Sequence, residues 1–374
     1  QLTPQNADTI QGGISVVNNQ PGTLAAKRLP LSLAWGEFRI QRDTLYLPGL
    51  QALLADGQLS LKGQASADTL ALQLGLDRLA SQALDPALPA HRVSGSVALG
   101  GSLRQPDMLV KLASGQLALD SRVALRDAPR RLLLDDLLLR TGAGRFQGKG
   151  QFGLDSQQLG FDGRFERFDP AVLDPRLPRG NVNGQLQARA SLGAKPQGDV
   201  SLRFAASQLG GEALGGQLAL AWQPQRVSAV NANLTLGRNR LQAQGAYGVA
   251  GDVLKLQLAA PDLSPLGAAF AGELNAQPAL AGTPARPDIS AQLQANRLAL
   301  PGGVQVASLN ADGRSGITPD SPFRLNLQGR GLQAGGQRLD EISLLTSGTR
   351  QAHQLNLALR GELQAKPQTL NLAL

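Results

Sequence analysis

Apolar and polar residues alternate along most of the chain. Leu70, Leu72, Leu74 and Leu76 occupy every second position of one run, and similar runs recur from residue 93 onward. Because successive side chains of a β-strand point to opposite faces, each run places its apolar groups on one face and Gln, Asn, Arg, Lys, Ser or Ala on the other. The alternation predicts strands that are covered on one side, mostly antiparallel, with Gly-rich turns between them.

Helical candidates are few and short. Residues 76–88, 168–177 and 263–270 are each interrupted by proline, which removes a backbone donor, so we expect a helical turn or two at most. Periodicity alone leaves RRLLLDDLLLR at residues 130–140 ambiguous. We interpret it as a strand because the Gly-rich sequence after it resembles other strand exits. The predicted fold class is therefore all-β.

The chain repeats itself at an interval of about 90 residues. LDPALP at residues 84–89 returns as LDPRLP at residues 173–178. Three related segments, GQLSLKG, GRFQGKG and NRLQAQG, place the openings of repeat units near residues 57, 144 and 239. Repeats that bury their apolar faces against neighbours form elongated, quasi-one-dimensional proteins. We expect residues 1–374 to form one continuous repeat module, and we interpret it as a fragment of a longer chain because it stops inside an alternating run.

Composition agrees with many short elements and excludes several kinds of site. Gly and Pro number 44 and 22, and aromatic residues make up only 3% of the chain. Cysteine is absent, which excludes disulfides, thiol catalysis and Cys-based zinc sites. His91 and His353 are the two histidines, too few for a multi-histidine metal centre. No apolar run reaches the roughly 20 residues of a membrane-spanning helix.

The motifs that could carry chemistry have structural interpretations. The sequence at residues 148–153 fits G-x-G-x-x-G, but a period-two pattern follows it instead of a helix, so we interpret these residues as turn glycines. Two pairs of adjacent carboxylates, Asp135 with Asp136 and Asp340 with Glu341, should point to opposite faces of a strand and form no acid/base couple. We predict no enzyme activity, no cofactor and no metal.

The formal net charge of +8 raises the question of a nucleic-acid partner. The arginines are scattered along the chain and few aromatic residues are available for base stacking, so we predict no nucleic-acid binding. Solvated outer faces account for most of these charges. An alternative is that arginines at the rim of an apolar groove attract anionic lipid headgroups.

Four segments resemble the TamB family: residues 16–31 (VVNNQPGTLAAKRLPL), 237–245 (GRNRLQAQG), 260–288 and 347–363. This family is the inner-membrane component of the translocation and assembly module, and it belongs to the AsmA-like, bridge-like lipid-transfer proteins. The resemblance implies a long sheet curled into a groove with an apolar interior (a β-taco). It further implies that this chain is an internal or C-terminal-half fragment of a protein that reaches from the inner to the outer membrane.

The resemblance also implies a function. Such a protein would carry phospholipids through the periplasm with their acyl chains on the apolar face, and would act with a TamA-like outer-membrane barrel in the assembly of outer-membrane proteins and autotransporters. The candidate groove-lining residues are Leu70, Leu72, Leu74, Leu76, Val97, Leu99, Val110, Leu112, Leu159, Phe161, Phe165, Leu218, Leu220, Trp222, Leu254, Leu256, Leu258, Leu325, Leu327, Leu355, Leu357 and Leu359.

Two other functions stay open at this point. Exposed sheet edges could pair with unfolded strands of outer-membrane proteins, which would make the chain chaperone-like. The alternating leucines could instead pack against one another in a sealed interior, as in an adhesin-like β-solenoid. The short coils usual in a solenoid conflict with a repeat of about 90 residues.

Overall fold

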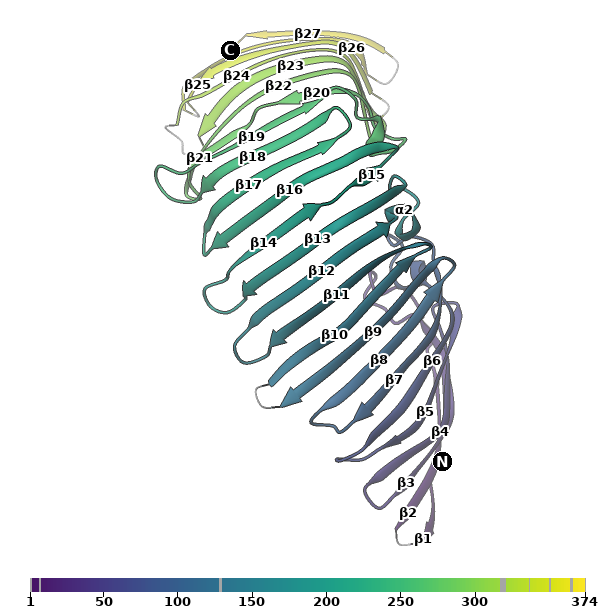
Figure 1. Ribbon diagram of the computed structural model, residues 1–374. Helices are drawn as coiled ribbons and strands as arrows, with labels where there is room; N and C mark the ends of the chain where they lie inside the picture. Colours follow the sequence, from purple (N-terminus) through teal and green to yellow (C-terminus); the bar gives the residue numbers. More distant parts are fainter. Residues whose placement is uncertain are drawn as a thin grey trace. The chain divides into compact units, whose positions relative to one another are not determined.

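The computed structural model describes residues 2–6, 8–127, 130–316, 321–335, 337–349, 351–363 and 366–373. These residues form antiparallel strands joined by short connections, with only three helical turns among them (Figure 1). The predicted all-β, antiparallel fold class is confirmed. The chain divides into two compact units, residues 1–175 (unit 1) and 176–374 (unit 2). No helix among the described residues has both the length and the hydropathy to cross a bilayer.

In unit 1 each strand pairs antiparallel with the next one along the chain. The elements are β1 (Leu2–Asn6), β2 (Thr9–Val17), β3 (Leu31–Gln41), β4 (Thr44–Leu54), β5 (Gly57–Ala65), β6 (Leu70–Ala80), α1 (Ser81–Leu84), β7 (Arg92–Gly101), β8 (Pro106–Ser114), β9 (Leu117–Asp127), β10 (Arg130–Thr141), β11 (Gly144–Gly153), β12 (Gln158–Phe168) and α2 (Pro170–Leu173). The ambiguous segment at residues 130–140 is a strand, as predicted.

Unit 2 continues the same antiparallel pattern with two interruptions. Its elements are β13 (Gly180–Ser191), β14 (Gln197–Phe204), β15 (Ser207–Leu209), β16 (Glu212–Gln223), β17 (Arg226–Leu236), β18 (Asn239–Tyr247), β19 (Val253–Ala260), η1 (Ser264–Leu266), β20 (Ala271–Ala276), β21 (Ala279–Thr283), β22 (Arg286–Leu300), β23 (Val304–Gly316), β24 (Phe323–Ala334), β25 (Gln337–Gly348), β26 (His353–Leu363) and β27 (Lys366–Ala373).

The two interruptions are strands broken in the middle. β14 and β15 both lie between β13 and β16 and pair with both of them. In the same way, β20 and β21 share the space between β19 and β22. Pro278 falls in the second break, where the absence of an N–H donor costs no ladder hydrogen bond.

The three helical turns recur at equivalent places. α1, α2 and η1 follow the ends of β6, β12 and β19, and all three lie within the segments predicted for them. Local sequence favours α2: Pro170 occupies its first turn and the Asp169 side chain accepts a hydrogen bond from the Ala171 N–H at 3.1 Å. The interval between these turns agrees with the repeat found in the sequence. Gly57, Gly144 and Asn239, near which the sequence places the openings of repeat units, begin β5, β11 and β18, and the division into these units stays a prediction.

The connections of successive repeats touch one another in unit 1. The Leu24 N–H donates to the Leu84 carbonyl oxygen at 2.9 Å. The His91 Nε2 atom lies 2.8 Å from the Leu173 carbonyl oxygen, which joins the connection after α1 to the end of α2. These hydrogen bonds supplement the strand ladders along the side of the sheet where the helical turns lie.

Bulges recur beside the helical turns. Arg78, Arg167 and Arg297 adopt left-handed backbone conformations, with φ of 51°, 47° and 49°. The residue after each arginine is buried, and a glycine lies opposite each of them. Gly144 shows why: a Cβ there would overlap the Arg167 carbonyl group. Because bulges bend a strand and increase its twist, they curve the sheet at these points.

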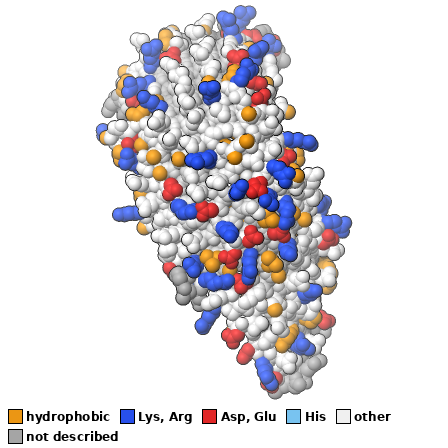
Figure 2. All heavy atoms as spheres, in the orientation of Figure 1, with side chains coloured by type: hydrophobic (Ala, Val, Ile, Leu, Met, Phe, Trp, Pro, Cys, Tyr) orange, Lys and Arg blue, Asp and Glu red, His pale blue; other side chains and the backbone are white. Residues whose placement is uncertain are grey.

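Side-chain burial alternates with period two along the strands. In β6, Leu72 and Leu74 are half-buried whereas Ala71 and Gln73 are exposed. In each unit, one face of the sheet is therefore apolar and the other polar (the apolar face and the polar face). Figure 2 shows lysine, arginine and acidic side chains spread over the strands turned to the viewer, with hydrophobic side chains scattered between them.

Candidate functional site

Cross-strand register gathers the apolar side chains of unit 1 into continuous rows. Three rows cross from β4 to β12 and contain no charged residue, which makes them the structural core of the apolar face. Their members are Leu47, Gly63, Leu72, Leu99, Met108, Val123, Leu134, Gly150 and Phe161; Leu50, Leu61, Leu74, Val97, Val110, Ser121, Leu137, Gly148 and Gly163; and Ala52, Leu59, Leu76, Gly95, Leu112, Leu119, Leu139, Phe146 and Phe165.

Unit 2 has an apolar face of the same construction. One row runs from β16 to β27, passing through β20 and not β21, and it too contains no charged residue. Its members are Gly216, Leu234, Leu241, Leu258, Ala276, Leu293, Ala311, Leu327, Leu344, Leu357 and Leu372. A shorter row joins Leu186, Leu202, Leu218, Ala232, Ala243 and Leu256.

The apolar face is covered only in part. Among the described residues, no large side chain has less than 2% of its surface exposed. In a sealed core of this size, many leucines would be fully buried. A compact buried cluster does occur in unit 2 beside η1, where Leu263, Leu298 and Val306 pack together. Elsewhere the leucines of the rows are mostly half-buried, which leaves hydrocarbon surface available to a ligand.

All the candidate groove-lining residues lie on the apolar face. Leu70 is buried, with 8% of its surface exposed, and the other candidates are half-buried. Leu159, which lies outside the rows given above, pairs with Phe152, and Trp222 pairs with Gly198. The structure thus brings the candidates together as two apolar faces, one in each unit. That they contact lipid stays a prediction.

Phenylalanines cluster at one place on the apolar face of unit 1. The ring centroids of Phe146 and Phe165 lie 4.6 Å apart, and those of Phe146 and Phe161 lie 6.1 Å apart. These rings cover Gly148 and Gly163, which pair directly with each other across β11 and β12. Because the glycines carry no side chain, the rings can lie close to the backbone. The sequence showed this only as Gly and Phe sharing the same face of β11 and β12.

One ion pair joins the neighbouring strands β8 and β9, and another joins the start of β17 to the connection before β19. Arg126 lies 3.1 Å from Asp107, and Arg226 binds Asp252 through two hydrogen bonds of 2.9 and 3.0 Å. The hydrogen bonds from Arg226 hold the pKa of the Asp252 carboxyl below its usual value, and the Val249 N–H adds to this effect. Part of the scattered basic charge is therefore paired within the sheet.

The glycine motif at residues 148–153 is a strand feature. We expected turn glycines, and this is wrong, because Gly148 and Gly150 lie inside β11. They sit on the apolar face, where the phenylalanine rings of β12 need the space of a missing side chain. β12 follows after a short turn, so the helix that a dinucleotide fingerprint requires is not there.

The adjacent carboxylates also differ from expectation in part. A register shift between Leu134 and Leu137 leaves both Asp135 and Asp136 exposed, so they do not alternate between the faces. The reason is the bulge, which our assumption of a regular strand did not include. Asp340 and Glu341 form separate ion pairs, with Arg338 at 3.0 Å and with Arg330 at 3.3 Å.

Both histidines contact neighbouring parts of the fold. His91 contacts the Leu173 carbonyl oxygen as described above, and the His353 ring lies 5.9 Å from the Phe323 ring. Within the part of the chain that the structure describes, no group of three or more His, Cys, Asp or Glu residues could hold a metal ion.

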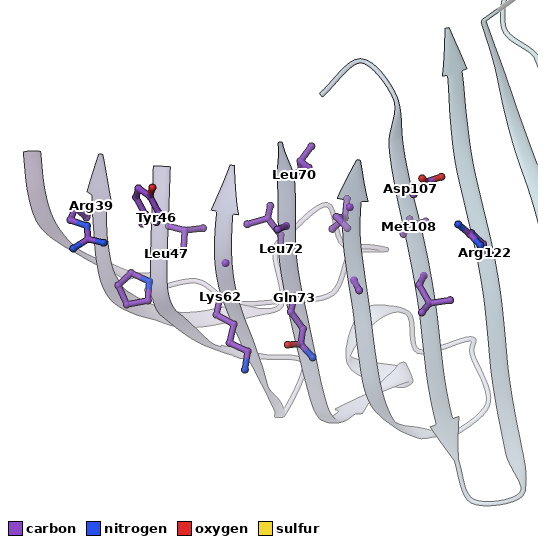
Figure 3. Close-up of a pocket in the computed structure, with 17 residues that line it drawn as sticks. Arg39, Tyr46, Leu47, Lys62, Leu70, Leu72, Gln73, Asp107, Met108 and Arg122 are labelled. Carbon is purple, nitrogen blue, oxygen red and sulfur yellow. The ribbon is translucent and has the colours of Figure 1, made fainter. Parts of the chain in front are cut away.

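A cavity of about 1000 Å³ lies on the polar face of unit 1, over β3 to β9. Figure 3 shows the Lys62 and Gln73 side chains of adjacent strands extending in the same direction. They begin a polar-face row that continues through Ala98, Leu109 and Arg122. The lining also includes members of the first apolar row, which alternate with these polar-face residues along the same strands: Leu47, Gly63, Leu72, Leu99 and Met108. Sequence analysis did not predict it.

Comparison with known families decides the assignment. A family model described as TamB, N-terminal domain, matches residues 122–373, about two thirds of the chain. The chain belongs to the TamB family. The match runs from within β9 to β27 and includes parts of both units. No curated protein and no solved structure matches the chain.

TamB membership agrees with the resemblance in the sequence and connects the chain with the translocation and assembly module. The matched model describes the N-terminal domain of TamB. The expected place of this chain, in the internal or C-terminal half of a longer TamB protein, stays a prediction. The apolar rows of β10 to β27 lie within the matched region, so the TamB model covers most of the surface that the candidates form.

Proposed function

We propose that this TamB-family chain carries phospholipids between the inner and outer membranes, with their acyl chains on the apolar face. The observation that supports this proposal most is the continuity of the charge-free rows in each unit. The half-buried state of their leucines supports it as well, because hydrocarbon surface is left for an acyl chain. Under this proposal the protein has no active site and needs no cofactor.

The energetics of such a face suit transfer better than storage. Burying a CH₂ group contributes roughly 0.8 kcal/mol, so a chain of about 16 carbons gains on the order of 13 kcal/mol relative to water. A lipid that comes from a bilayer has already gained this energy, so its net change on entering the groove is close to zero. Rows made largely of leucine offer many similar positions, which lets a chain slide without a deep trap.

The proposal includes location and partners. Headgroups would remain in water, where arginines at the rim of the groove attract anionic ones. The chain would act in the periplasm with a TamA-like outer-membrane barrel, and its lipid transfer would serve the assembly of outer-membrane proteins and autotransporters. The family match to the translocation and assembly module supports this part of the proposal.

Photo-crosslinking at neighbouring positions tests the proposal. Leu256 pairs with Ala243 on the apolar face, whereas Gln257 pairs with Gln242 on the polar face. A photoreactive residue at Leu256 should capture phospholipid from cells, and the same residue at Gln257 should capture little. Mass spectrometry of the crosslinked chain measures both. Equal capture at the two positions would contradict a one-faced groove.

The same experiment separates the other functions. A sealed interior would give no lipid adduct at Leu256 and no phospholipid on extraction of the purified chain. A chaperone-like chain would capture unfolded polypeptide instead, with protection of edge backbone amides from exchange and no need for lipid.

A further inference from the structure

The cavity on the polar face of unit 1 has a floor of small residues. Ala71 on β6 and Ala98 and Gly100 on β7 form its centre, while Pro48 and Leu109 stand on either side. Leu109 is 44% exposed although it projects from the polar face. The hollow therefore arises because small residues are flanked by larger ones, and most of its surface is apolar.

Basic residues surround this apolar floor. Arg39, Lys62 and Arg122 line the cavity, and no carboxylate of the described residues forms an ion pair with any of them. Asp107 is the acidic residue of the lining, and its charge is balanced by Arg126 at 3.1 Å. The cavity is thus strongly basic for its size.

The positive charge is concentrated at the β3–β5 end. Arg122, on β9, stands in register with Asp136 on β10, which offsets part of its charge. Arg39 lies with its guanidinium 4.9 Å from the centre of the Tyr46 ring, which holds the side chain in place. Lys62 is two strands from Arg39 and two residues along β5 from Gln64, which is in register with Arg39, so the two Cα positions are about 12 Å apart at the usual spacings. A single anionic group between them could contact both.

We propose that this cavity binds a single-chain anionic amphiphile of the lysophospholipid type. Its anionic headgroup lies between Arg39 and Lys62, and its acyl chain follows Ala71 and Ala98 toward Leu109. The volume of about 1000 Å³ is at the upper end of the usual range for small-molecule sites, which combine an apolar lining with a few polar groups. The cavity shares Leu70, Leu72 and Leu99 of its lining with the apolar face, but the basic residues and the small residues of the polar face carry this proposal, which does not depend on the proposed transport function.

The backbone of the floor favours an acyl chain over a peptide. The strands beneath the cavity are paired on both sides, so their N–H and C=O groups already have partners. A peptide lying on this floor would leave its own backbone groups without hydrogen bonds on the side facing the sheet. A hydrocarbon chain has no such requirement.

Isothermal titration calorimetry of the full chain tests the site. The probes are lysophosphatidylglycerol, which is anionic, lysophosphatidylcholine with the same acyl chain, which is zwitterionic, and inorganic phosphate, with both lipids below their micelle concentrations. We expect saturable 1:1 binding of lysophosphatidylglycerol, at least tenfold weaker binding of lysophosphatidylcholine, and no measurable binding of phosphate. Equal affinity for the two lipids, equally tight binding of phosphate, or no binding at all would overturn the proposal.

Variants locate the bound molecule. Ala98→Leu fills the floor of the cavity. The double substitution Arg39→Gln with Lys62→Gln removes the contacts to the headgroup. Each of these changes should weaken the binding of lysophosphatidylglycerol at least tenfold. Lys111→Gln is the matched control, because Lys111 lies on the polar face outside the cavity lining. Val97→Asn changes the neighbouring residue on the apolar face and should leave binding unchanged. Circular dichroism confirms that each variant keeps its β-structure.

The outcomes separate this site from the proposed transport. Binding that Val97→Asn weakens and Ala98→Leu does not would place the amphiphile on the apolar face and overturn the assignment. Loss of crosslinking at Leu256, which is in unit 2, would contradict transport and leave this test unaffected.

Discussion

Single residues determine how closely side chains approach the sheet at β11 and β12. Gly148 and Gly163 lie under the rings of Phe161 and Phe146, and a Cβ at Gly163 would lie 2.7 Å from the Phe146 ring. Such a contact cannot be accommodated without moving the ring or the strand. The aromatic cluster therefore depends on glycine at these two positions.

Gly163→Ala should lower the free energy of unfolding by about 1–3 kcal/mol, because overpacking displaces the rings. Gly13→Ala is a matched control: its Cβ would have its nearest neighbour at 3.8 Å, an ordinary van der Waals distance. Urea denaturation of both variants measures the difference. Equal stability of the two would show that the rings move freely and do not depend on the glycine.

The Arg226–Asp252 pair should make stability depend on pH. Because the pKa of Asp252 is lowered in the folded chain, the pair stabilises the fold above the ordinary pKa of about 3.9, and this contribution is lost as the pH falls through the lowered value. Asp252→Asn should thus lower the urea midpoint at pH 7, and the difference from the unmodified chain should shrink below about pH 4.

Asp340→Asn is the control for this prediction. The Arg338–Asp340 pair lies in solvent, with 59% and 44% of the two side chains exposed, and such pairs contribute little to stability. Urea midpoints measured from pH 7 to pH 3 compare the two variants. A constant difference for Asp252→Asn across this range would contradict a role for the ionised carboxylate.

For single residues, the sequence predicts on which face of the sheet a side chain lies, but not which side chains of other strands it contacts. Period-two alternation was enough to assign Leu254, Leu256 and Leu258 to one face, because that assignment needs only the strand itself. It was not enough to place Phe146 over Gly163. That contact depends on the register between β11 and β12, which the sequence pattern does not specify.

Arginines in a left-handed backbone conformation mark the bulges of three strands. The arginines at the bulges are unusual because residues other than glycine rarely adopt a left-handed conformation, at a cost of about 1–3 kcal/mol. The buried residue that follows each arginine compensates for this cost. Each bulge therefore strains the backbone at the arginine, and the bend that it produces directs the next side chain inward. These side chains are Leu79, Phe168 and Leu298.

Arg297→Gly should leave stability unchanged or raise it, since glycine adopts the observed φ of 49° without strain. Arg297→Val should lower it by about 1–2 kcal/mol, because a branched side chain is poorly accommodated there. The ion pair with Glu273 is a minor factor, because its arginine is 82% exposed. Thermal or urea denaturation measures both variants. A valine variant as stable as the glycine variant would contradict the assigned bulge geometry.

Element positions were largely predictable and bulges were not. Alternation identified the strands, and proline spacing limited α1, α2 and η1 to single turns. The prediction of turn glycines at residues 148–153 was wrong because the sequence does not distinguish glycines within a strand from glycines in a turn. Bulges insert a residue without changing composition, so only the pairing of β10 with its neighbours reveals the one at Asp135 and Asp136.

At the scale of the whole molecule, the function proposed for the chain depends on uninterrupted apolar rows in both units. Val110→Arg in unit 1 and Leu256→Arg in unit 2 should each reduce the phospholipid that copurifies with the chain, because a buried charge is costly next to an acyl chain. Ala113→Arg and Gln257→Arg, on the exposed polar face, should have little effect. Quantitative lipid extraction measures all four variants. If only one of Val110→Arg and Leu256→Arg reduced the copurifying lipid, the proposal that both units bind acyl chains would be contradicted.

The spacing of the helical turns can be compared with the repeat in the sequence. The repeat of about 90 residues found in LDPALP and LDPRLP returns in the positions of the helical turns. The expectation of one continuous module over residues 1–374 stays a prediction. The cavity under Lys62 could not be predicted, because it requires small residues of β6 and β7 to meet larger ones from β4 and β8 across several pairings.

The row construction of the apolar face also makes its length adjustable. In an antiparallel sheet, inserting or deleting one hairpin adds or removes two neighbouring members of every row and about 10 Å of lining. The remaining strands keep their direction, and their side chains keep pointing to the same faces, so the apolar face stays apolar. Duplication or deletion of hairpins would therefore lengthen or shorten the apolar lining of a unit in small increments without changing which side chains face it.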